Sequence, residues 1–364
     1  MIASLIAMPV SWRSNQRKTI AANIGSAGDG KDRLRKLRWA LCLNLMIAAL
    51  SGGICRAAAA ASKVVIAYSS LNERGAGALL VARDQGFFRK HDLDVQLIFM
   101  RNGAVALSAL SAGEAQFYSG SANGSALGAM ANGLDLVFIA GLANKLNGTM
   151  VAAPSIRSPG DLKGKNIAIQ SIGGGVWMIT QLVLEHWRLD PKRDGINLRI
   201  VGDESVMVQS LVLGTVDATY AGYAYATMLK KQGFRVLADL TKLGIPFQST
   251  AILARRSYLA SSPATAEKIV RALVEAIAFI QRPTNKAAVV ATLTKSLQIV
   301  RPEEAEEGYE VIRNIYERRV FPNVEGIDNA IRLLGMSNEK IRQLKAASLV
   351  DDSIVKKLDK EGLF

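Results

Sequence analysis

The sequence has 364 residues, more than one hydrophobic core usually organises, so we expect two domains or lobes. Apolar residues make up 49% and charged residues 21%, a globular balance, while aromatic residues at 6% are sparse for a carbohydrate-stacking or single-stranded nucleic-acid surface. The formal charge is +14, but residues 1–61 hold nine of the 45 basic and two of the 31 acidic residues. The other 303 residues therefore carry only +7, which does not predict a nucleic-acid partner.

Cysteine and histidine usage excludes several kinds of active site. Cys42 and Cys55 both lie within residues 1–61, and His91 and His186 are the only histidines of the sequence. Residues 62–364 therefore lack the side chains for disulfides, thiolate nucleophiles and Cys-based zinc sites, and offer little for a Ser-His-Asp triad. We predict no catalytic residue, no metal site and no cofactor.

Residues 33–61 have the order of a secretory signal peptide. A basic run at 33–38 is followed by an apolar stretch at 39–54 and by five alanines at 57–61. The alternative is a membrane anchor, but this interrupted apolar stretch is shorter than the roughly 20 residues that span a bilayer. We predict export by the general secretory route, cleavage between Ala59 and Ser62, and a periplasmic mature protein.

After this leader, strand and helix patterns alternate along the chain, which is typical of a parallel α/β sheet. The first half predicts strands at 63–70, 94–100, from 116 and at 134–140, with helices at 77–88, 104–110 and 125–131. The pattern restarts after Pro154, with strands at 166–170, 197–201, 218–221 and 235–238 and helices at 176–187, 205–213 and 225–231. A strand at 250–253 is expected to return to the first sheet.

The remaining chain is predicted to be helical. Ser262 is a good N-cap with Pro263 in the first helical position, and an apolar stripe follows: Ile269, Leu273, Ile277 and Ile280. Further helices are expected at 285–297, 303–318, 327–334 and 338–346. The predicted organisation is a leader (1–61), the first part of lobe 1 (62–153), lobe 2 (154–248), and a return to lobe 1 with C-terminal helices (249–364).

Four short segments resemble periplasmic solute-binding proteins. They are ARDQGFFRK at 82–90 with Leu93-Asp94-Val95, LSAGE at 110–114, DLKGK at 161–165 and LGTVDA at 213–218. The similar group, SsuA/THI5-like and NMT1-like, serves uptake of nitrate, sulfonates, taurine and thiamine-precursor pyrimidines. Two departures are Gln116, where the group carries an acid, and the absence of a proline shortly after Ala218, near the expected ligand pocket.

This resemblance implies a two-lobed periplasmic-binding-protein fold (type II-like), in which each lobe is a mostly parallel sheet flanked by helices, with a helical C-terminal tail. It implies a monomeric component of an ABC-type uptake system that captures a small anionic or zwitterionic solute between its lobes. A sulfonate, carboxylate, nitrate-like anion or pyrimidine precursor would then pass to an inner-membrane permease and its ATPase.

Two alternative functions are a ligand-sensing periplasmic protein and an enzyme of the same fold. The similar pyrimidine-precursor synthases and porphobilinogen deaminases depend on cysteines that residues 62–364 lack. We therefore expect a protein that is not an enzyme.

Ligands of open α/β sheets bind beyond the carboxyl ends of strands, where helix N-termini present free N–H groups to anions. The predicted ligand contacts come from four such places: Ser69, Ser70; Ser119, Gly120, Ser121, Asn123; Ser171, Gly173, Gly174, Trp177; and Tyr220, Tyr223. The alternatives are an N-cap at Ser121 or Asn123, a flexible glycine turn, and core packing for Trp177. Since no loop contains a basic residue, a monoanion with an apolar body fits best.

Overall fold

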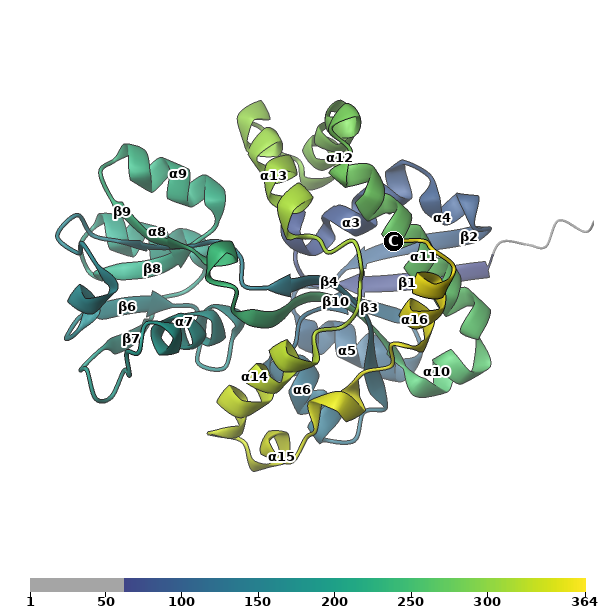
Figure 1. Cartoon of the computed structure of the whole chain (residues 1–364), viewed down its shortest axis with the longest axis horizontal. Helices are drawn as coiled ribbons and strands as arrows, with labels where there is room; N and C mark the ends of the chain where they lie inside the picture. Colours follow the sequence, from purple (N-terminus) through teal and green to yellow (C-terminus); the bar gives the residue numbers. More distant parts are fainter. Residues whose placement is uncertain (1–61) are drawn as a thin grey trace, which may run out of the picture. The chain divides into compact units, whose positions relative to one another are not determined.

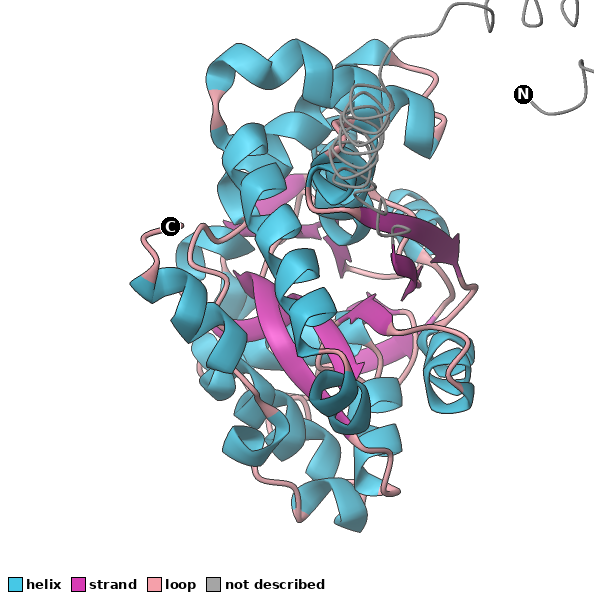
Figure 2. Ribbon diagram, turned by 90° about the vertical axis from the view of Figure 1, so that its right-hand side faces the viewer, coloured by secondary structure: helices cyan, strands magenta, loops and turns pink. Residues whose placement is uncertain are grey.

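The computed structural model describes residues 62–364, so the predicted signal peptide lies outside the described residues. Two five-stranded sheets, each flanked by helices, form the two predicted lobes (Figure 1). The turned view of Figure 2 shows helices on both sides of the strands.

The first sheet contains four strands that precede lobe 2 and one that follows it. Their order is β2-β1-β3-β10-β4. The strands are β1 (Ser62–Tyr68), β2 (Leu93–Phe99), β3 (Phe117–Gly120), β4 (Leu136–Lys145) and β10 (Pro246–Arg255). β10 runs antiparallel to both of its neighbours, whereas β1 pairs in parallel with β2 and β3. Four of the five strands therefore share one direction.

The second sheet repeats this arrangement with the order β7-β6-β8-β5-β9. Its strands are β5 (Thr149–Ala152), β6 (Asn166–Ile169), β7 (Asn197–Ile200), β8 (Ala218–Ala221) and β9 (Arg235–Asp239). Here β5 is the antiparallel strand. Its helices are α7 (Gly175–His186), α8 (Glu204–Val212) and α9 (Tyr223–Lys231).

The chain crosses between the sheets at two places, after β4 and before β10 (Figure 1). The sequence analysis expected lobe 2 to span residues 154–248, whereas the strands of the second sheet lie within residues 149–239. β5, which was not predicted, already joins the second sheet before Pro154, and Thr250 lies inside β10. A four-residue buried strand such as TMVA gives too little periodicity for its assignment from sequence.

The helices of lobe 1 follow the predicted order. They are α3 (Glu73–Asp84), α4 (Phe87–Lys90), α5 (Gly103–Ala112), α6 (Gly124–Ala131), α10 (Arg256–Ser261), α11 (Pro263–Gln281), α12 (Lys286–Leu297), α13 (Pro302–Ile315), α14 (Val324–Gly335), α15 (Glu339–Arg342) and α16 (Ser353–Lys360). Of these, α10 and α16 were not predicted. The helix expected at 77–88 instead begins at Glu73 and ends before Gly86, which takes a left-handed conformation with φ of 78°.

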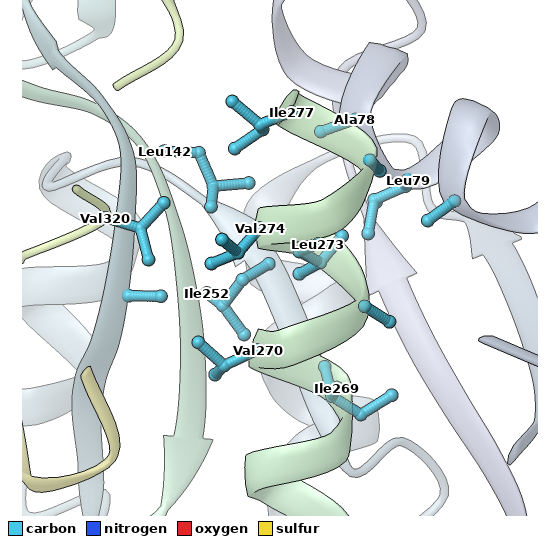
Figure 3. Packing of buried hydrophobic residues seen from close by; sticks show 14 of the residues in the cluster. Ala78, Leu79, Leu142, Ile252, Ile269, Val270, Leu273, Val274, Ile277 and Val320 are labelled. Carbon is cyan, nitrogen blue, oxygen red and sulfur yellow. The ribbon is translucent and has the colours of Figure 1, made fainter. Parts of the chain in front are cut away.

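The main core lies between the first sheet and α11. The predicted stripe of Ile269, Leu273, Ile277 and Ile280 is fully buried in this core, and Pro263 does begin the helix. Figure 3 shows α11 between sheet residues such as Ile252 and the side chains of α3. Ser262 occupies the N-cap position, but its side chain makes no capping hydrogen bond, contrary to the prediction.

Candidate functional site

A polar cavity of about 290 Å³ lies between the lobes. Lobe 1 contributes the ends of β1 and β3 and the first turn of α3, and lobe 2 contributes β8 and the starts of α7 and α8. Seven of the twelve predicted ligand contacts line it: Ser69, Ser70, Ser119, Gly120, Ser121, Asn123 and Tyr220. Strand ends from both sheets thus converge on this cavity, as expected for a ligand site of open α/β sheets.

The loop at 119–123 lines the cavity and also starts a helix. Asn123 is the N-cap of α6, because its Oδ1 accepts a hydrogen bond of 3.0 Å from the Ala126 N–H. Its amide nitrogen donates to Ser121 Oγ at 3.1 Å and so holds that hydroxyl in place. Ser119 is buried, and its hydroxyl donates to the Gly75 carbonyl at 3.4 Å. The capping alternative is therefore confirmed for Asn123, which lines the cavity as well.

Arg74 is the main feature that the sequence analysis missed. It lies in the first turn of α3, whose N-cap Asn72 accepts from the Gly75 N–H at 2.9 Å. The predicted helix began at Gly77, so Arg74 belonged neither to a predicted ligand-binding loop nor to a predicted helix. The four predicted loops contain no basic residue, but Arg74, which lies in the first turn of α3 just after the Ser69-Ser70 loop, lines the cavity. An Asn followed by a Glu is a recognisable helix start, and this signal was available in Asn72-Glu73.

The Arg74 guanidinium connects the two lobes. Its Nη1 donates to the Tyr220 hydroxyl of lobe 2, and also to Asn147 Oδ1 at 3.3 Å in the connection between β4 and β5. Two carboxylates flank it: Glu73 Oε1 is 3.5 Å from Nε, and Glu204 Oε2 is 3.8 Å from Nη2. Glu204 was also missed, although it lies shortly after a predicted strand, at 197–201.

Burial and charge act in opposite directions on this group. Desolvation disfavours the charged form of Arg74, but the Tyr220 hydroxyl, Glu73 and Glu204 outweigh it, so the pKa of the guanidinium lies above its usual value. Burial raises the pKa of the Tyr220 phenol, which stays neutral. Arg74 and Glu204 are the charged side chains among the cavity-lining residues, so the formal charges of the lining balance.

Tyr118 extends the polar wall on the lobe 1 side. Its hydroxyl lies 2.8 Å from Ser69 Oγ. Burial raises the pKa of Tyr118, and the bond to Ser69 offsets only part of that increase. The hydroxyl is therefore neutral at physiological pH and can both donate and accept.

Gly148 positions Tyr220. It has a φ of 87°, and a Cβ there would lie 2.5 Å from a ring carbon of Tyr220 and 2.6 Å from its hydroxyl. We expect Gly148→Ala to displace this hydroxyl from Arg74 and to weaken solute binding about tenfold or more, in line with one lost charge-assisted hydrogen bond. Calorimetric titration of both proteins measures the effect.

Gly233→Ala is the matched control, because Gly233 has a φ of 90° but no atom within 4 Å of the added Cβ. It carries the same backbone strain of about 1 kcal/mol without the collision. Equal binding losses in both variants would contradict the assigned role of Tyr220.

The other five predicted contacts lie outside this cavity: Ser171, Gly173, Gly174, Trp177 and Tyr223. Gly173 and Gly174 form the turn that starts α7, with Gly174 as its N-cap. Trp177 is 9% exposed and packs in the hydrophobic core, as the alternative expected. Tyr223 donates to Asp239 Oδ1 at 3.0 Å and lines a separate cavity.

That second cavity, about 640 Å³, lies between α9 of lobe 2 and helices α12 and α13 of lobe 1. Half of its lining residues are charged, and some of these pair with one another, since Lys286 lies 3.1 Å from Glu306. Burial raises the pKa of Tyr223 to about 12, and Asp239 adds to this increase.

The described residues lack two kinds of feature, a cluster of metal ligands and a membrane-spanning helix. Across residues 62–364, no group of three His, Cys, Asp or Glu side chains is arranged to hold a metal ion. Over the same described range, none of the helices combines the length and the apolar character needed to cross a membrane.

Comparison with known proteins gives one family and several structural neighbours. The family model described as NMT1/THI5 like matches residues 75–286. No curated protein matches the sequence.

Among solved structures, the aliphatic sulphonate binding protein SsuA from Escherichia coli is similar, with a TM-score of 0.65 and 20% identity over 80% of this chain and 92% of its own. A sulfonate-binding protein from Methylobacillus flagellatus aligns with a TM-score of 0.68 and 18% identity over 84% and 96% of the two chains. The nitrate-binding protein NrtA from Synechocystis has a TM-score of 0.62 and 12% identity over 82% and 88%. These similarities show the fold of a periplasmic binding protein.

Proposed function

Because the chain belongs to the NMT1/THI5-like family, we propose that it is the extracytoplasmic solute-binding component of an ABC-type uptake system. It captures a small anionic or zwitterionic solute between its lobes and delivers it to an inner-membrane permease that works with an ATPase. The sulfonate- and nitrate-binding names of the structural neighbours agree with this solute class. The signal-peptide pattern of residues 33–61 supports a periplasmic location.

The observation that carries this proposal is the pairing of Arg74 from lobe 1 with Tyr220 from lobe 2 in one polar cavity. A guanidinium is the side chain best suited to sulfonates and carboxylates, because its donors form a planar fork. The cavity volume of about 290 Å³ suits a small solute. Since groups of both lobes face the cavity, a bound solute stabilises the conformation in which the lobes are closed. The permease then recognises this closed conformation.

An enzymatic function has less support from the site. The cavity lining contains neither cysteine nor histidine, and its one carboxylate, Glu204, is bound to a backbone N–H and to Arg74. A binding function needs no nucleophile and no general base, so it accounts for the lining better.

The experiment is native mass spectrometry of the protein purified from its periplasmic fraction without refolding. We expect a co-purified small molecule that carries a sulfonate, carboxylate or comparable anionic group. If the protein is empty, a thermal-shift screen with anions and zwitterions follows, in which a solute at a hundredfold excess over its Kd adds about 2.7 kcal/mol. No shift with any of them would contradict the proposed function.

A further inference from the structure

The carboxylate of Glu204 occupies a position that suits an anionic ligand. Glu204 is the first residue of α8, and it reaches from lobe 2 toward lobe 1. Its Oε1 accepts a hydrogen bond from the Gly222 N–H, and its Oε2 lies 3.8 Å from the Arg74 guanidinium. The carboxylate of the cavity-lining Glu204 thus contacts both a cationic fork and a backbone donor.

A guanidinium together with a backbone N–H is the kind of donor set that binds carboxylates and sulfonates in proteins. The two donors come from different lobes: Arg74 lines the cavity with a side chain that is only 15% exposed, and Gly222 directly follows β8, the strand that carries the cavity-lining Tyr220. Gly222 leaves room for this contact, because a Cβ there would lie 2.9 Å from Glu204 Oε1 and 3.5 Å from Arg74 Nη2. The three groups therefore meet at one point.

We propose that Arg74 and the Gly222 N–H form an anion subsite and that Glu204 is its internal occupant, which a solute anion must displace. This inference rests on the proposed function and deepens it by assigning the subsite and its competitor. Glu204 pairs with the Nη2 side of the guanidinium, the side that a solute anion would use, while the cavity is empty. Its carboxylate also repels anions, and only a solute with further contacts overcomes that repulsion.

The chain supplies a matched control for this competition. Glu73 contacts the same guanidinium at 3.5 Å, but on the Nε side, and it does not line the cavity. Glu73→Gln and Glu204→Gln therefore remove the same charge from neighbours of one arginine, and only the second vacates the subsite.

The test is calorimetric titration of the full chain with methanesulfonate and with acetate, at fixed low ionic strength. We expect Glu204→Gln to bind these monoanions at least about tenfold more tightly than the unaltered protein, since a like charge within hydrogen-bond reach of the subsite is removed. Glu73→Gln is expected to change the affinity less than about threefold. Adding Arg74→Gln to Glu204→Gln should abolish the gain, and thermal melting verifies that each variant is folded.

Three results would overturn the inference: no gain in Glu204→Gln, an equal gain in Glu73→Gln, or a gain that persists without Arg74. Absence of measurable monoanion binding in Glu204→Gln counts as the first of these. If a native solute is nevertheless found on the unaltered protein, the proposed function stands and only the role of Glu204 fails. Glu204→Ala repeats the measurement if the glutamine variant melts early.

Discussion

Replacing Arg74 by glutamine is expected to reduce the affinity for the native solute by about 30- to 100-fold. The variant loses charge-assisted hydrogen bonds, each with a net contribution of about 1.5–3 kcal/mol. It also leaves the Glu204 carboxylate in the cavity without its cationic partner, which adds repulsion toward an anion. Calorimetric titration with the solute identified by mass spectrometry gives the ratio directly.

Arg332→Gln is the control for this variant. Arg332 of α14 also bridges the lobes, with two bonds of 2.9 and 2.7 Å to Glu185 of α7, but its side chain is 48% exposed and lies outside the cavity. A solvent-exposed ion pair contributes about 0.2–1 kcal/mol, so we expect a change in affinity below about fivefold. Similar losses in both variants would mean that bridging of the lobes, and not anion recognition, is the function of Arg74.

Replacing Leu273 by alanine is expected to lower the free energy of unfolding by about 3–4 kcal/mol. Leu273 is fully buried on α11 among residues of α3 and of the first sheet (Figure 3), and a cavity in such a packed layer collapses only in part. Urea denaturation followed by circular dichroism measures the loss.

The same substitution at an exposed position is the control, because it removes the same atoms without leaving a cavity in the core. Leu213, at the end of α8, is 69% exposed, so Leu213→Ala is expected to change the unfolding free energy by less than about 0.5 kcal/mol. Comparable losses at both positions would contradict the description of the core. Solute affinity is expected to be unchanged in both variants, because neither side chain lines the polar cavity.

Most of the fold could be predicted because its local signals agree with its topology. Buried strands with β-branched residues and helices with an apolar stripe, such as Ile269 to Ile280 on α11, are visible within short windows. β5 was missed because four buried residues carry no periodicity, and α16 because its apolar face is small. Missing β5 put the predicted start of lobe 2, at residue 154, after the first strand of the second sheet.

The site could be predicted only in part, because its decisive contacts join distant residues. Arg74 and Tyr220 are 146 positions apart, and nothing near either residue indicates the other. The rule about strand ends found Ser119, Asn123 and Tyr220. Applied also to the predicted strand at 197–201, the same rule leads to Glu204, which lies four residues beyond the end of β7 and lines the cavity.

The position of β10 between β3 and β4 has a consequence for the order in which the chain folds. All strands of the second sheet lie within residues 149–239, so that lobe is complete as soon as this continuous stretch is available. The first sheet stays divided until Arg255 has been synthesised, because its gap is filled only by β10. We therefore expect lobe 2 to fold before lobe 1, whose first sheet is completed only when β10 inserts between β3 and β4.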